Sequence, residues 1–77
     1  MTAGAVDEGM SVVGVLVAAA DDFAARAQAQ EERRDRAQPG TGGHHLHAHS
    51  ATLWRLAEGC LRARIEQLEL AAAATAE

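Results

Sequence analysis

The 77-residue chain has no tyrosine and no lysine, and it has one each of phenylalanine, tryptophan, cysteine and proline. A single cysteine cannot form an intrachain disulfide, which indicates a reducing compartment or a fold that needs no covalent cross-link. Two large aromatic residues cannot fill a deep core, and a domain of this size buries only roughly 60% of its unfolded surface. These shortages favour a small helical protein that completes its burial against another molecule.

Positive charge is also scarce, because the net charge is −4 and the seven basic residues are all arginine. An acidic balance argues against a general affinity for phosphate backbones, and carboxylates flank the basic cluster 33-RRDR-36, so we do not expect nucleic-acid binding. The apolar run 12-VVGVLVAAA-20 is too short to cross a bilayer. These features predict a cytoplasmic protein that does not enter a membrane.

The N-terminal half of the chain predicts one helix. Residues 1–10 combine glycines with small and acidic residues without periodicity, so we expect a flexible arm there. From Val12 onward, apolar residues recur at three- and four-residue steps, which places them on one helix face. A Pro-Gly pair ends this pattern. We therefore predict a helix over about 11–37, with Ser11 as its N-cap, and a Gly-rich turn over 39–43.

The C-terminal half carries the strongest helical pattern, with a broad apolar face and a charged face. Its first residue has two candidate positions. Ser50 is a good N-cap and would leave the histidines in the loop. A start near Gly43 or His44 continues the apolar face backwards, and the lack of a helix breaker before Ser50 favours it. We therefore predict a helix over about 44–75.

Two helices joined by a short turn form an antiparallel hairpin, so the predicted fold is all-α with a single domain over 11–77. One hairpin buries one stripe of each helix and leaves the large apolar residues partly uncovered. Dimerisation into a four-helix bundle would cover them more fully. The residues expected at this interface are the large side chains of the two apolar faces: Leu16, Phe23, Leu53, Trp54, Leu61, Ile65 and Leu68.

All four histidines lie in the segment 44-HHLHAH-49, which is the candidate metal site of the chain. In an extended segment, His45, His47 and His49 would alternate onto one side and reach one ion. In a helix, His45 and His49 would share a face and supply two ligands, so a second chain would have to complete the site. Asp and Glu are absent from residues 37–57, so no local carboxylate can orient an imidazole.

Neither the cysteine nor the histidines suggest catalysis. A catalytic cysteine needs a nearby cation or helix N-terminus to stabilise its thiolate, and Cys60 lies mid-helix, where we interpret it as a small core residue. No catalytic residue is predicted. The sequence therefore predicts a small non-enzymatic interaction protein that docks through an apolar helix face on itself or on a larger protein, as a homo-oligomer, accessory subunit or regulator. The alternative hypothesis is a transition-metal-binding protein that holds Zn, Ni or Cu at the histidine segment; no other cofactor is expected.

Overall fold

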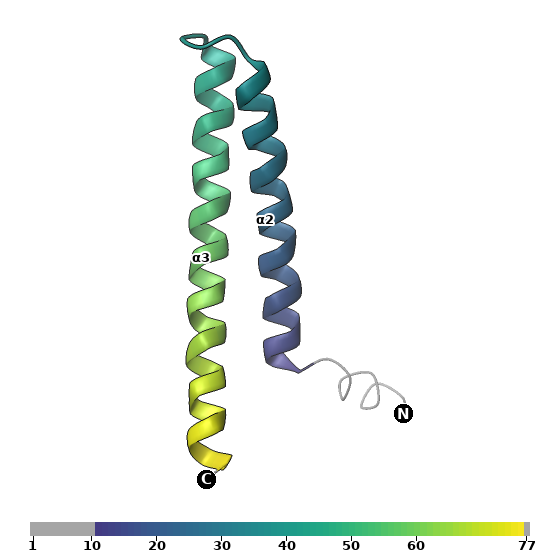
Figure 1. Cartoon of the computed structure of the whole chain (residues 1–77), viewed down its shortest axis with the longest axis vertical. Helices are drawn as coiled ribbons and strands as arrows, with labels where there is room; N and C mark the ends of the chain where they lie inside the picture. The colour runs from purple at the N-terminus through teal and green to yellow at the C-terminus, as the bar shows by residue number, and fades with distance from the viewer. Residues whose placement is uncertain (1–10, 77) are drawn as a thin grey trace, which may run out of the picture.

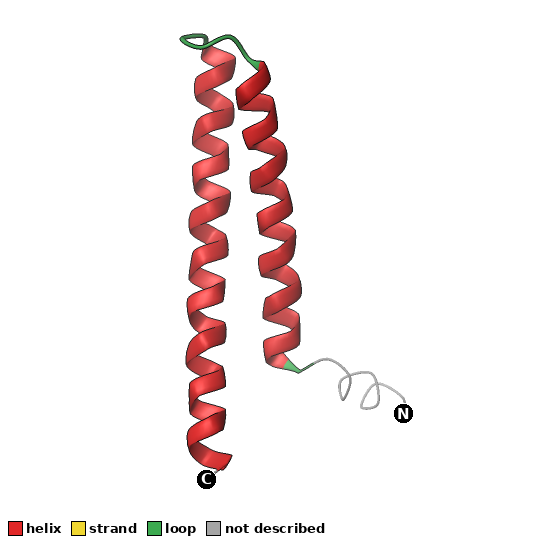
Figure 2. Cartoon of the chain, in the orientation of Figure 1, coloured by secondary structure: helices red, strands yellow, loops and turns green. Residues whose placement is uncertain are grey.

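The computed structural model describes residues 11–76, and this part of the chain folds into two helices, α2 (Val12–Arg36) and α3 (Gly42–Ala76). The helices lie side by side and run antiparallel, with a short turn between them at one end (Figures 1 and 2). The predicted all-α antiparallel hairpin is therefore confirmed. The arm predicted over 1–10 lies outside the described residues.

Capping interactions fix both ends of α2. Ser11 has an extended backbone, and its hydroxyl accepts a hydrogen bond from the backbone N–H of Gly14 at 3.0 Å, as an N-cap does. At the other end Ala37 leaves the helical conformation, and its N–H donates to the carbonyl oxygens of Arg33 and Arg34. The last turn is rich in arginine, which suits the negative end of the helix dipole. Helix α2 is thus shorter than the predicted range by one residue at each end.

A threonine that precedes two glycines starts α3. The Thr41 hydroxyl donates to the carbonyl oxygen of Gln38 at 2.6 Å and accepts from the backbone N–H of His44 at 3.2 Å. Before it, Gly40 adopts a φ of 87°, a left-handed conformation that glycine reaches without steric cost. The helix therefore begins at Gly42, and the alternative start at Ser50 is wrong, because Ser50 lies inside α3.

The core between the helices is thin because small residues line it. The buried apolar residues of the described chain are three alanines and one isoleucine, and no large side chain there is fully buried. Beside this alanine contact, the rings of Phe23 and Trp54 meet with their centroids 5.1 Å apart. The Arg26 guanidinium lies over the Trp54 ring at 5.1 Å from its centroid, which adds a cation–π contact. The buried residues are Ala20, Ala27, Ala51 and Ile65.

The two helices differ in length, since α2 has 25 residues and α3 has 35. The C-terminal turns of α3 therefore continue past the first residue of α2 (Figure 1). Neither described helix combines the length and the hydrophobicity that a membrane span requires.

Candidate functional site

The contact between α2 and α3 already uses most of the residues that the sequence predicted for a contact between two copies. Ile65 is buried between the helices, and the half-buried residues lie along the edge of this contact. Leu53 differs from the rest, because 53% of it is exposed. The half-buried residues of the predicted set are Leu16, Phe23, Trp54, Leu61 and Leu68.

A second apolar surface runs along the side of α3 that α2 does not cover. Four leucines on this helix keep more than half of their surface in solvent: 71% for Leu46, 53% for Leu53, 62% for Leu56 and 65% for Leu70. They belong to a row of exposed residues spaced alternately by three and four positions. We call this row the outer stripe; it consists of Leu46, His49, Leu53, Leu56, Cys60, Ala63, Gln67 and Leu70.

The outer stripe corrects the interpretation of Cys60 as a core residue, because its thiol group is free and the residue is exposed. The sequence pattern joined Leu56 and Cys60 to one broad apolar face. Helix α2 covers one edge of that face and leaves the other edge in solvent. The available signal was the regular spacing of Leu46, Leu53 and Cys60 at seven-residue intervals, which marks a separate stripe.

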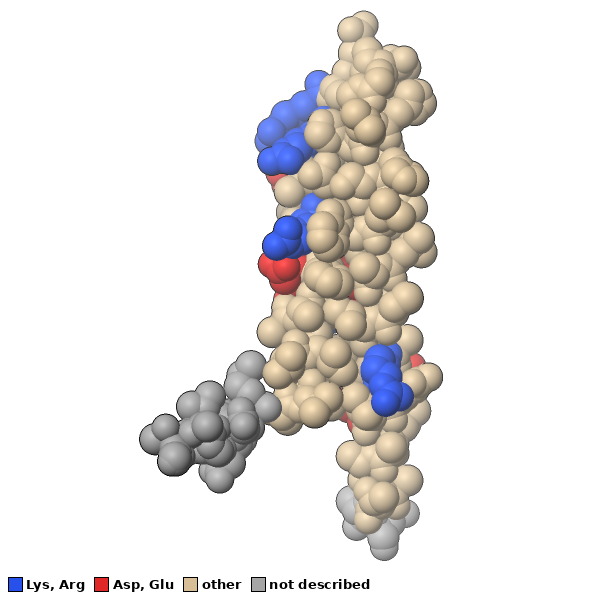
Figure 3. Space-filling view, turned by 180° about the vertical axis from the view of Figure 1, so that it is seen from behind, with Lys and Arg blue, Asp and Glu red and all other residues tan. Residues whose placement is uncertain are grey.

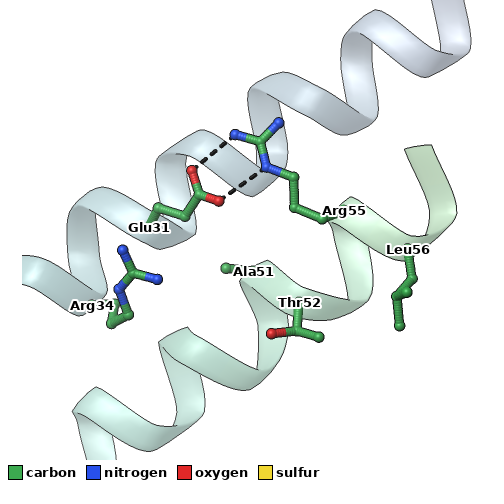
Figure 4. A pocket seen from close by; sticks show the side chains of 6 residues that line it. All are labelled: Glu31, Arg34, Ala51, Thr52, Arg55 and Leu56. Atoms are coloured by element: carbon green, nitrogen blue, oxygen red, sulfur yellow. Dashed lines mark hydrogen bonds and ion pairs between the residues drawn. The ribbon is translucent and has the colours of Figure 1, made fainter. Parts of the chain in front are cut away.

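Charged side chains of α3 gather on the opposite side and connect it to α2. Arg55 forms a bidentate pair with Glu31 of α2, with both N–O distances at 2.9 Å (Figure 4). Glu58 accepts from Arg55 at 3.1 Å and from Arg62 at 2.8 Å, and Arg62 reaches Asp21 of α2 at 3.1 Å. We call these five residues the charged network.

Hydrogen bonding within the charged network shifts the pKa values of Glu31, Glu58 and the two arginines. The hydrogen bond from Arg55 lowers the pKa of the Glu31 carboxyl. Hydrogen bonds from Arg62 and then Arg55 lower the pKa of Glu58. The pKa of Arg55 is raised by its hydrogen bonds to Glu31 and then Glu58, and that of Arg62 by its hydrogen bonds to Glu58 and then Asp21. Each ion pair therefore favours its charged form, which is the behaviour of a cross-link between helices and not of a proton-transfer site.

An open hollow lies next to the charged network, between α2 and the N-terminal half of α3 (Figure 4). Glu31 and Arg55, which line this hollow, form an ion pair with each other. Thr52 also lines it, and its hydroxyl donates to the carbonyl oxygen of Ala48 at 3.0 Å. The other residues that line the hollow are Arg34, Ala51 and Leu56. The polar groups in this hollow thus serve the hairpin, and they form no nucleophile–base pair.

Helix α3 divides the four histidines between two sides. The Nδ1–H of His44 donates to the carbonyl oxygen of Arg34 at 3.1 Å, and the Nδ1–H of His47 donates to Oε1 of Gln30 at 2.7 Å. His45 and His49 are exposed, at the i and i+4 spacing of the helical alternative. The helix does not have the extended geometry in which His47 would join them. Within residues 11–76 no three potential metal-binding side chains come together.

The face of the hairpin opposite the view of Figure 1 carries its charged side chains along the edges (Figure 3). The middle of this face, formed by both helices, shows residues other than Lys, Arg, Asp and Glu (Figure 3). The middle of this hairpin face is therefore uncharged, and the ionic side chains visible on it lie at its borders.

Comparisons of the chain with models of known protein families, with curated protein sequences and with solved structures found no match. The fold and its surface define the class directly: an antiparallel two-helix hairpin with a solvent-exposed leucine stripe on its longer helix.

Proposed function

We propose that the chain is a non-enzymatic interaction protein, and that two hairpins pair through the apolar surface of α3 into a four-helix bundle. One observation supports this proposal above all. Four leucines of a single helix are more than half exposed, while the core of the hairpin buries three alanines and one isoleucine. A soluble protein rarely exposes an apolar stripe of this kind unless another molecule covers it.

Burial of the exposed leucines is the driving force available for self-association. Burying a leucine side chain contributes about 1.5–3 kcal/mol, and each of these four leucines still has more than half of its surface to bury. The chain can act through such a dimer as a homo-oligomer or as an accessory subunit that presents two hairpins.

Sedimentation equilibrium of the untagged chain at micromolar concentration tests the proposal. We expect twice the chain mass of 8.1 kDa. Replacing two exposed leucines with the variant Leu53→Gln/Leu56→Gln should give a monomer of unchanged helicity, because neither side chain is needed inside the hairpin. Ala25→Gln, at an exposed position of α2, is the matched control and should remain dimeric. A wild-type chain that stays a folded monomer up to about 100 μM would contradict the proposal.

Metal binding is a second candidate function, and one observation favours it. His45 and His49 are both exposed and share a helix face, whereas His44 and His47 are engaged with α2. Two imidazoles are half of a tetrahedral zinc site, so two chains would have to bring their pairs together. Tag-free protein should then take up one Zn per two chains and melt at a higher temperature with Zn. His49→Gln should abolish both effects, and an unchanged melting temperature with Zn, Ni and Cu would exclude the site.

A further inference from the structure

We infer that the outer stripe binds the outer stripe of a second copy, with the two α3 helices antiparallel and Leu56 of each copy level with Cys60 of the other. This inference rests on the proposed self-association and adds the contact surface, the direction and the register. In the resulting assembly the two α3 helices lie at the centre, and each α2 lies on the outside.

The spacing of the outer stripe is that of a helix-pairing seam. Its members alternate between three- and four-residue steps from Leu46 to Leu70, which is the repeat of about 3.5 residues that keeps a stripe facing a partner helix. This span corresponds to a seam about 36 Å long at a rise of about 1.5 Å per residue. Helix α2 packs on the other side of α3, so α3 has apolar residues on two sides. This is the pattern expected of a helix that has a packing partner on each of two sides.

The sizes of the side chains favour the antiparallel direction. About a centre near residue 58, Leu53 of one copy is level with Ala63 of the other, and Leu56 is level with Cys60, so the two central leucines each meet a small side chain. Towards the ends Leu46 is level with Leu70, and His49 is level with Gln67, where an imidazole and an amide can hydrogen-bond. Interdigitation of large and small residues fills a seam without voids. In a parallel pair each residue would meet its own copy. Ala63 would then face Ala63 and leave a gap, and two copies of Gln67 would be buried against each other.

The residues that flank the outer stripe are compatible with this register. Glu66 of the second copy falls between His45 and Thr52 on one flank, where an imidazole and a hydroxyl can both donate to its carboxylate. Arg64 of the second copy falls between Ser50 and Ala57 on the other flank. No two like charges meet, because the remaining charged residues of α3 face α2 or solvent.

Gly59 is an independent indication of a close approach at the centre of this contact. Glycine in the middle of a helix is destabilising, so its presence calls for a structural reason. The hairpin supplies none, since a Cβ added at Gly59 would meet no atom within 4 Å. In the antiparallel pair the two copies of Gly59 face each other across the two-fold axis, where the absence of a side chain lets the helices approach closely.

Distances between spin labels on the full-length chain test the direction. In a Cys60→Ala background, which removes the thiol and keeps a small apolar side chain in the outer stripe, labels are attached to Gly43→Cys and, in a separate variant, to Ala73→Cys, at exposed positions outside the outer stripe. The antiparallel register predicts a separation of about 45 Å for two labels at position 43, and a short distance when a copy labelled at 43 pairs with one labelled at 73. Leu56→Gln should abolish both distances, and Val15→Gln, an exposed apolar position of α2, should leave them unchanged.

The possible results separate the antiparallel register inferred here from the proposed self-association on which it rests. A dimer with a short distance between two labels at position 43 is parallel and overturns this inference, while the proposed self-association stands. That result would instead suit the zinc site, because the antiparallel register places the two His45–His49 pairs about 33 Å apart. A dimer that survives Leu56→Gln uses another face and also overturns the inference. A chain that remains monomeric overturns the inference and the self-association together.

Discussion

Gly59→Ala should change two measurable quantities in opposite directions. In the single hairpin the added methyl group meets no neighbour within 4 Å, so the substitution acts through helix propensity alone. Alanine in place of a mid-helix glycine stabilises by about 0.5–1 kcal/mol. For a domain of this size that gain corresponds to a rise of roughly 2–8 °C in melting temperature.

The same methyl group has no room in the proposed dimer. Two copies of Gly59 face each other at the centre of the antiparallel contact, and inserting methyl groups into a well-packed contact costs about 1–3 kcal/mol. The dissociation constant of the dimer should therefore rise by roughly tenfold to hundredfold. Stability of the hairpin and stability of the dimer are thus expected to separate in this variant.

The assay combines thermal melts followed by circular dichroism, at concentrations well below the dissociation constant of the dimer, with sedimentation equilibrium above it. Gly43→Ala is the matched control, because Gly43 is also an exposed helical glycine without close neighbours but precedes the first residue of the outer stripe, far from the centre of the proposed contact. It should leave the dissociation constant unchanged. If Gly59→Ala stabilised the hairpin and left the dimer equally tight, the close approach of two α3 helices at this position would be refuted.

Three further predictions concern the hairpin itself. Trp54→Ala removes the half-buried ring that packs on Phe23, so the free energy of unfolding in urea should fall by about 2 kcal/mol, near half the cost for a fully buried ring; a change below 0.5 kcal/mol would contradict this packing. The pKa values of Glu31 and Glu58 are lower in the folded state than their usual 4.5, so their ion pairs stabilise the hairpin above that pH and are lost as the pH falls through the lowered values. The melting temperature should accordingly drop as the pH falls below 4.5, and should drop less in Glu58→Gln. Thr41→Ala removes the N-cap of α3 and should cost about 1 kcal/mol of stability, with faster amide exchange confined to the first turn; unchanged exchange there would exclude the capping role.

The helices and their antiparallel arrangement could be predicted because both follow from local sequence. The periodic apolar residues specify two helices, and the Pro-Gly pair at 39–40 separates them. The first residue of α3 was harder to predict, since Thr41 and Ser50 are both competent N-caps. The structure uses Thr41, whose hydroxyl also binds the turn at Gln38. That second contact depends on the fold of the turn and cannot be read from a periodic pattern.

The surface was less predictable than the helices because it depends on how α3 is rotated against α2. A broad apolar face on a helix does not specify which edge the neighbouring helix covers. Here Ala27 of α2 and Ala51 of α3 are buried, and this close contact leaves Leu53 and Leu56 in solvent. The same rotation directs His47 toward Gln30 and leaves His45 exposed. Long-range packing therefore decides which predicted interface and metal residues remain available.

The charged network explains why the outer stripe, and not the opposite side of α3, is left for a second copy. Arg55 and Arg62 tie α3 to α2 through Glu31 and Asp21, and Glu58 joins the two arginines on their own helix. A partner that approached from that side would have to desolvate ion pairs that the hairpin already satisfies, which is costly. The outer stripe needs no such desolvation, because its eight residues carry hydrocarbon, thiol, imidazole and amide groups and no carboxylate or guanidinium. Electrostatics thus directs the hairpin contact to one side of α3, and apolar burial favours the second contact on the other.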